Sequence, residues 1–128
     1  MTTEYVKKLV LAYPSIKQIW LIGSRANGTA RADSDWDYLV FTDDGHVLNA
    51  LYRDKKRSSP EIDVLLVVDG RHAINPWSVD TWTKSLCLDD LPGNLAWQLI
   101  SDTEAQYRPR QFSENKQLEA AKRVFPLA

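Results

Sequence analysis

The stretch GSRANGTARADSDWDYLVF, residues 23–41, and the segment EIDVLLV, residues 61–67, decide the fold of this 128-residue chain. The first stretch passes from a Gly-Ser pair through ten polar or small residues to an Asp-Trp-Asp triplet, and then becomes aromatic and apolar. The second segment is apolar apart from its two acids. Runs rich in β-branched and aromatic residues predict strands. We therefore expect two strands that each carry acidic residues.

Helical and strand patterns alternate around these two strands. Apolar residues recur at helical spacing after Thr2 and Thr3 and stop at Pro14, which predicts a first helix. The β-branched run over 16–22 predicts a strand that ends at the Gly-Ser pair. A second helix is expected over 47–57, between strands over 35–41 and 62–68. This alternation predicts the α/β (α+β) class, with a short mixed sheet flanked by helices.

The second half of the chain carries weaker patterns. The expected elements are a helix marked by Leu95, Ala96, Leu99 and Ile100, a short strand over 105–108, and a last helix capped by Ser113 and buried through Leu118, Ala121 and Phe125. Trp77, Trp82 and Trp97 also lie in this half. Aromatic residues of this size serve the core of a small domain or an interface. We favour the core.

Composition limits the classes of function. The chain has 16 basic and 17 acidic residues, a formal net charge of -1, which disfavours bulk nucleic-acid binding. Its single cysteine, Cys87, excludes an intramolecular disulfide and a multi-cysteine metal site. The N-terminus lacks the continuous apolar stretch of a secretory signal or a membrane span, so a cytoplasmic location is expected. The length fits one domain over residues 1–128.

Three acids suggest a metal site. Side chains alternate across a strand, so Asp35 and Asp37 point to the same face, with Cα atoms about 6.6 Å apart. Asp63 shares its face with apolar residues, where a lone carboxylate is costly unless it is paired or binds metal. If the two strands are neighbours, the three acids form an oxygen cage suited to Mg²⁺. Two such ions would serve an in-line phosphoryl displacement.

The Gly-Ser pair suggests a phosphate contact. A glycine at position 23 lets the backbone approach phosphates closely, and a helix that begins there would turn N–H groups and the Ser24 hydroxyl toward the anion. Arg25 is a candidate for added positive charge. Asp-X-Asp and Gly-Ser are each common in solvated turns, and neither alone indicates a site. Their order, spacing and strand context together favour the catalytic interpretation.

With these residues in place, the chain resembles the nucleotidyltransferase superfamily that includes the DNA polymerase β palm, and more narrowly the minimal nucleotidyltransferases. The resemblance implies a palm-like fold, two Mg²⁺ ions, and ATP or another nucleoside triphosphate as substrate. Gly23 and Ser24 would touch the triphosphate, Asp35 and Asp37 would bind both metals, and Asp63 would bind the catalytic metal and help activate the acceptor hydroxyl. Trp36 departs from the small aliphatic residue of relatives, and we expect it on the face opposite the acids.

The resemblance also implies a partner. Minimal relatives often act as antitoxins beside a small HEPN-type ribonuclease toxin, and some place AMP on a tyrosine of that toxin. We take this as the specific hypothesis for the present chain. The alternatives are a non-catalytic module that binds nucleotide or a partner, and a small-molecule or nucleic-acid nucleotidyltransferase that self-associates as a dimer.

Overall fold

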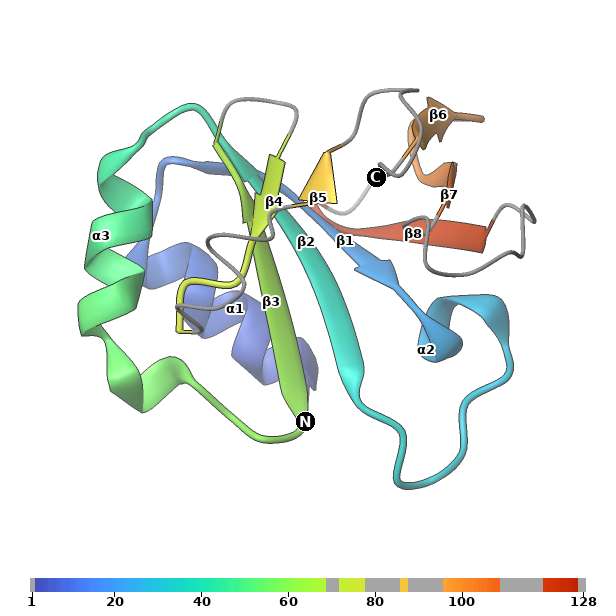
Figure 1. The fold of residues 1–128 in the computed structure, drawn as a ribbon, viewed down its shortest axis with the longest axis horizontal. Helices are drawn as coiled ribbons and strands as arrows, with labels where there is room; N and C mark the ends of the chain where they lie inside the picture. The colour runs from blue at the N-terminus through green and yellow to red at the C-terminus, as the bar shows by residue number, and fades with distance from the viewer. Residues whose placement is uncertain (1, 69–71, 78–85, 88–95, 109–118, 127–128) are drawn as a thin grey trace.

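Helices and strands alternate up to Val67 in the computed structural model, and the described elements after that residue are all strands (Figure 1). The structure describes residues 2–68, 72–77, 86–87, 96–108 and 119–126. The helical elements are α1 (Thr2–Ala12), α2 (Ser24–Asn27), α3 (His46–Arg53) and the 3-10 turn η1 (Lys55–Arg57). The strands are β1 (Ile16–Ile22), β2 (Trp36–Thr42), β3 (Ile62–Val67), β4 (His72–Ile74), β5 (Leu86–Cys87), β6 (Ala96–Leu99), β7 (Glu104–Arg108) and β8 (Glu119–Phe125).

The elements predicted for the first half are confirmed. α1 ends just before Pro14, whose ring cannot continue a helix. β1 covers the predicted residues, and β2 and β3 lie within one residue of the predicted ends. α3 ends at Arg53 rather than Arg57, and most of the remaining basic run forms η1. The strong periodicity of this half was therefore a reliable guide.

The strands form a mixed sheet in the order β5-β4-β3-β2-β1-β8-β7-β6. β2 and β3 are parallel, and the other neighbouring pairs of described strands are antiparallel. Parallel neighbours need a crossover connection, which α3 and η1 provide. The predicted mixed α/β architecture is confirmed, and the parallel pair is the one that carries the acids.

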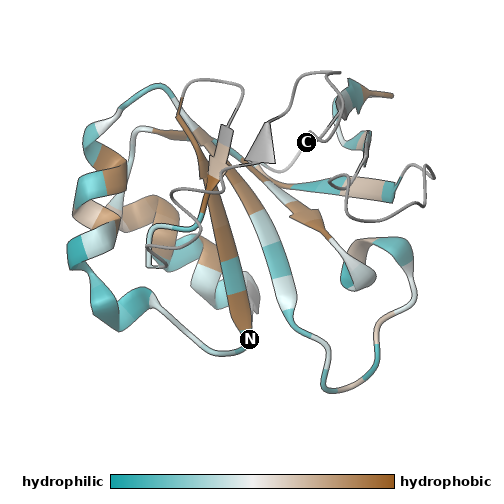
Figure 2. Cartoon of the chain, viewed as in Figure 1, coloured by the Kyte–Doolittle hydropathy of each residue, from teal (hydrophilic) through white to brown (hydrophobic). Residues whose placement is uncertain are grey.

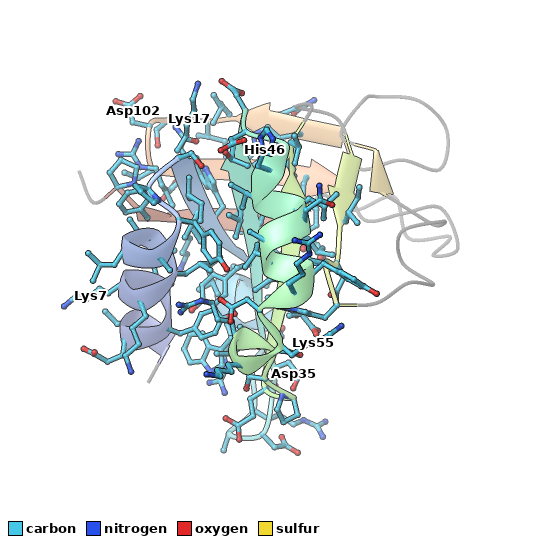
Figure 3. All side chains as sticks on the ribbon, turned by 90° about the vertical axis from the view of Figure 1, so that its left-hand side faces the viewer. Lys7, Lys17, Asp35, His46, Lys55 and Asp102 are labelled. Atoms are coloured by element: carbon cyan, nitrogen blue, oxygen red, sulfur yellow. The ribbon has the colours of Figure 1, made fainter. Side chains whose placement is uncertain are left out.

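The two longer helices, α1 and α3, lie together on one face of the sheet (Figures 1 and 3). Leu9 of α1 and Leu51 of α3 are almost inaccessible and join the first core cluster with Val40 and Val64 of the central strands. β3 is apolar along most of its length, interrupted by a hydrophilic band (Figure 2). Helices α1 and α3 therefore cover this face of the central strands, and Asp37 and Asp63 belong to the other face.

A second core cluster lies on the opposite face, because its strand residues alternate with those of the first. It combines Trp20, Ile22, Leu39, Val67 and Ala73 with Ala105, Tyr107 and Ala121 of β7 and β8. The ring of Trp97 on β6 meets Trp20 edge-on, with centroids 5.2 Å apart, and lies 5.6 Å from Phe41 of β2. Because β6 ends the strand order, the sheet must curl to bring these rings together.

Two predicted helices are wrong. Residues 96–99 form β6, and 119–125 form β8. Leu99 and Ile100 are 67% and 58% exposed, so the residues that suggested a helix here do not form a buried apolar face. β8 is rich in helix formers, but pairing with β1 on one side and β7 on the other overrides that propensity. The predicted short strand over 105–108 is confirmed as part of β7.

Ser113, Leu118 and Leu95, which the predicted helices used, lie outside the described residues, as does Trp82. The core interpretation is confirmed for the other two tryptophans of this half. Trp77 packs against the first cluster and its Nε1 donates a hydrogen bond to the Leu51 carbonyl at 2.6 Å, while Trp97 packs against the second cluster. No helix among the described residues is long and apolar enough to cross a membrane.

Candidate active site

The parallel register of β2 and β3 sets Asp37 directly opposite Asp63. The condition on which the expected acid cluster depends, that these strands are neighbours, is therefore met. A side-chain hydrogen bond joins the two carboxyl groups, of which Asp37 is half-buried and Asp63 exposed. Asp35 lies just before β2, is exposed, and is labelled at the lower end of the molecule in Figure 3. The acids thus gather where β2 and β3 begin.

Burial raises the pKa of the Asp37 carboxyl to about 7 from an ordinary value of 3.8. The hydrogen bond with Asp63 and the negative charges of Asp63 and Asp35 act in the same direction. Each of these causes penalises negative charge on Asp37, and a nearby cation would offset that penalty. Carboxylate oxygens are the ligands that Mg²⁺ prefers. The chemistry of the acids therefore fits the implied metal.

Fewer candidate metal ligands lie together in the structure than the sequence suggests. Among the described residues, no three His, Cys, Asp or Glu side chains form a group that could hold a metal ion. The expected three-acid cage is represented by the Asp37–Asp63 pair, with Asp35 near enough to act on Asp37 electrostatically. The metal-binding roles of all three acids stay predictions.

Gly23, at the end of β1, has φ 76° and ψ -159°, a backbone region that is essentially restricted to glycine. A Cβ atom at this position would overlap Oδ2 of Asp37. Ile22 pairs with Asp37 across β1 and β2, which explains the close approach. Gly23 therefore serves the site by leaving room for the Asp37 carboxylate.

Ser24 begins α2, so a helix does start at the Gly-Ser pair, although it has only four residues. The backbone N–H groups of Ala26 and Asn27 donate to the Gly23 carbonyl at 3.0 Å, which closes the turn. Gly28 then ends α2 in the left-handed conformation. Contact of Gly23 and Ser24 with a triphosphate stays a prediction.

Arg25 is engaged within its own loop. Its guanidinium donates to the carbonyl oxygens of Ala32 at 3.3 Å and Ser34 at 2.9 Å, and lies 4.3 Å from the ring centroid of Trp36. Trp36 packs against the first core cluster, on the face opposite Asp37, as predicted. A phosphate contact from Arg25 would require its side chain to leave these partners. Its nucleotide-binding role stays a prediction, and the observed contacts order the loop that leads to Asp35.

Two functional candidates were missed from the sequence. The hydroxyl oxygen of Tyr107 on β7 accepts a hydrogen bond from the Gly23 N–H at 3.2 Å, and it donates to Glu119 Oε2 on β8 at 2.9 Å. The predicted strand over 105–108 was the available signal for Tyr107. Nothing in the sequence indicated that this strand returns to the Gly-Ser turn.

A separate groove of about 1190 Å³ lies on the helical face, between α1, the residues around η1 and the end of β8. It is lined mainly by apolar and basic side chains, including Leu11, Trp36 and Phe125. Neither the three acids nor the Gly-Ser pair line it. The groove is therefore not the site of the acid chemistry.

A mixed α/β fold with paired acids beside a Gly-Ser turn defines the chain as having a nucleotidyltransferase-type domain. The sequence model of the polymerase beta nucleotidyltransferase family matches residues 4–67, and the chain belongs to this family. A search of curated proteins gives no significant match. The matched region contains β1 to β3 and all three acids, but ends before β6 to β8.

Among solved structures, one described as the toxin-antitoxin with AMP-PNP is similar at 22% identity and a TM-score of 0.37. The alignment covers 52% of the present chain and 57% of that chain, which is less than two thirds of its length. We transfer no ligand or partner from this likeness.

Proposed function

We propose that this protein transfers a nucleoside monophosphate from a nucleoside triphosphate to an acceptor hydroxyl, with Mg²⁺ held by Asp35, Asp37 and Asp63. The observation that carries the proposal is the pairing of Asp37 with Asp63 on adjacent parallel strands, directly beside the Gly23 turn. Family membership supports the general class of reaction.

In the proposed reaction, the acceptor oxygen forms a bond to the α-phosphorus while the bond to the β-phosphate oxygen breaks, and pyrophosphate leaves. The Mg²⁺ ions, when bound, supply positive charge for the attacking and leaving oxygens. The chain's own residues bind and orient the reactants. Asp35 and Asp37 would hold the metal and through it the triphosphate, Gly23 leaves room for the Asp37 carboxylate, and Asp63, the exposed member of the pair, would help to remove the hydroxyl proton.

The first test is calorimetric titration of ATP with Mg²⁺ into wild-type protein and the Asp35→Ala/Asp37→Ala variant. We expect metal-dependent binding in the wild type and its loss in the variant, because the variant lacks two of the three proposed ligands. Circular dichroism should show both proteins folded, since Asp35 is exposed and Asp37 carries an unfavourable charge. Failure of every common nucleoside triphosphate to bind would count against the proposal.

The single variants Asp35→Ala and Asp37→Ala test catalysis. Phosphoryl transfer depends almost entirely on positioning and on charge stabilisation, so each variant should lose detectable transfer of labelled nucleotide. The matched control is Asp33→Ala, which removes an exposed acid from the same loop and should leave transfer unchanged. Unchanged activity in either site variant would refute its metal assignment.

For the acceptor, we propose a tyrosine hydroxyl of a HEPN-type toxin partner, with AMP from ATP as the transferred group. This step is supported only by what is implied by the resemblance to minimal nucleotidyltransferases. Co-expression with the protein encoded beside it should give a complex and a mass increase of one or more nucleotides on that partner. A partner that neither binds nor gains mass would leave the transfer reaction standing but remove this acceptor.

A further inference from the structure

Among the described residues, two hydrogen bonds join the C-terminal strands to the segment Gly23–Asn27, which follows β1. At the start of the turn, the Gly23 N–H donates to the Tyr107 hydroxyl at 3.2 Å. At its end, the Asn27 side-chain oxygen accepts a hydrogen bond from the Ala120 N–H of β8 at 2.8 Å. The segment Gly23–Asn27 is thus fixed at both ends by residues that lie 84 and 93 positions further along the chain.

We propose that Tyr107 is a positioning residue for the nucleotide site, holding the Gly23–Asn27 turn against Asp37 through the Gly23 N–H, with Glu119 orienting its hydroxyl. The proposal rests on the proposed function, because the ligand that gains from an ordered turn is the metal-bound nucleoside triphosphate. It adds to the site a hairpin, β7 and β8, that lies outside the matched family region.

The Tyr107 hydroxyl is suited to this role by its surroundings. The residue is only 4% exposed and belongs to the second core cluster, so its ring is held by packing. An ordinary tyrosine hydroxyl is protonated at neutral pH, and burial, followed by the hydrogen bond to Glu119, raises the pKa of this hydroxyl further. A protonated hydroxyl accepts from Gly23 and donates to Glu119 at the same time. The hydrogen-bond directions along this chain are therefore fixed.

Gly23 needs such a support. Glycine has more backbone freedom than any other residue, and its conformation here is accessible to almost no other residue. The Tyr107 contact limits that freedom at the point where the Gly23 backbone meets the Asp37 carboxylate. It also engages the Gly23 N–H, so, within the described part of the chain, the free N–H groups at the start of α2 are those that follow Gly23.

The test compares Tyr107→Phe with Tyr5→Phe. Tyr5 is a matched control because its partly buried hydroxyl donates to the Arg57 carbonyl at 2.8 Å on the helical face of the sheet. We expect amide hydrogen exchange at Gly23 to accelerate in Tyr107→Phe and to stay unchanged in Tyr5→Phe. We also expect the affinity for ATP with Mg²⁺ to fall about five- to tenfold in Tyr107→Phe alone, as for the loss of one hydrogen bond.

Two further variants test the role of Glu119. Glu119→Gln keeps an acceptor for the Tyr107 hydroxyl and should retain near wild-type affinity, whereas Glu119→Leu removes the acceptor and should behave like Tyr107→Phe. A merely structural role would lower thermal stability in these variants without separating them by nucleotide affinity. Equal affinity in Glu119→Gln and Glu119→Leu would overturn the orienting role.

The outcomes separate the inference from the proposed function. Unchanged exchange at Gly23 in Tyr107→Phe overturns the contact, whether or not nucleotide binds. Faster exchange with unchanged affinity overturns the positioning role while the proposed function stands. A wild-type protein that binds no nucleoside triphosphate refutes the proposed function and the role in nucleotide binding, and the exchange rate still decides whether Tyr107 holds the turn.

Discussion

The two halves of the chain differ in how they contribute to the site. Residues 2–67 supply the acids and the Gly-Ser turn from a local sequence pattern, and they contain the matched family region. Strands β6 to β8 supply no proposed ligand, but they pack against the acid-bearing face and contact the turn. The proposed reacting groups therefore lie within one part of the sequence, whereas distant strands contact the turn beside them.

The first prediction concerns a variant that weakens the packing of the C-terminal strands against the rest of the sheet. Trp97→Ala removes a half-buried ring that contacts Trp20 and Phe41 across the curled sheet. We expect a loss of about 3 kcal/mol in the free energy of unfolding, the low end for tryptophan truncation, because the ring is not fully buried. Urea denaturation measures the loss, and affinity for ATP with Mg²⁺ should fall with it because Tyr107 packs beside Trp97.

The control for that experiment is Trp97→Phe, which keeps an aromatic ring in the second core cluster and should lose less than half as much stability. If the two halves were independent, Trp97→Ala would give two separate unfolding transitions and leave the transition of residues 2–67 unchanged. A single cooperative transition at lower urea is the expected result.

A second prediction sharpens the comparison within the turn itself. Gly23 and Gly28 both have φ 76°, but only a Cβ at Gly23 would meet the Asp37 carboxylate, while a Cβ at Gly28 meets nothing within 4 Å. Gly28→Ala should cost about 1 kcal/mol from backbone strain alone. Gly23→Ala should cost at least about 2 kcal/mol and should also abolish nucleotide binding. Thermal unfolding and calorimetry measure the two effects.

The contradictory result would be equal nucleotide affinity in Gly23→Ala and Gly28→Ala. It would mean that the Asp37 carboxylate can move away from the turn without loss of function. The contact between glycine and acid would then be a packing detail.

The third prediction concerns the stability cost of the acid pair. The pKa of Asp37 is raised to about 7 in the folded protein, so between about pH 4 and pH 7 the folded state binds more protons than the unfolded state. Stability therefore falls as the pH rises through this window. Asp37→Asn removes that dependence, and in metal-free buffer its Tm should exceed the wild-type Tm by a few degrees at pH 8 but not at pH 4.

The control for the pH experiment is Asp33→Asn, which changes an exposed acid in the preceding loop and should give the same difference in Tm at both pH values. A wild-type Tm that does not fall relative to Asp37→Asn between pH 4 and pH 8 would contradict the raised pKa. The expected result would show that an acid of the site is kept at a cost to stability.

The sequence predicted much of the first half and the acid pair for a physical reason. β1 to β3 are apolar runs ended by turn residues, and Asp37 and Asp63 interrupt β2 and β3. The expected burial of Asp63 is wrong, because its side chain is exposed, and Asp37 is the half-buried acid of the pair. No pattern in the sequence indicates the contact of Tyr107 with Gly23, because this contact depends on the curl of the sheet. The helix expected from the spacing of Leu118, Ala121 and Phe125 is wrong because residues 119–125 pair with β1 and β7, and a spacing pattern does not reveal that pairing.

The last prediction, with the smallest effect, concerns the other wrongly predicted helix, where the structure has β6. If 95–100 were a helix, Leu99 would lie on its buried stripe and Leu99→Gln would cost more than about 2 kcal/mol. In the structure, Leu99 ends the edge strand β6 and is 67% exposed, although its partner Ala105 on β7 is 1% exposed. Leu99→Gln should therefore change the free energy of unfolding by no more than about 0.5 kcal/mol, as for other surface positions. Ala105→Gln, which places the same side chain at the buried partner position, should be strongly destabilising in the same urea titration. Similar losses of stability in both variants would contradict the assignment of Leu99 to an exposed position of β6. A loss confined to Ala105→Gln would show that this region is packed through β7 and Trp97 rather than through Leu99.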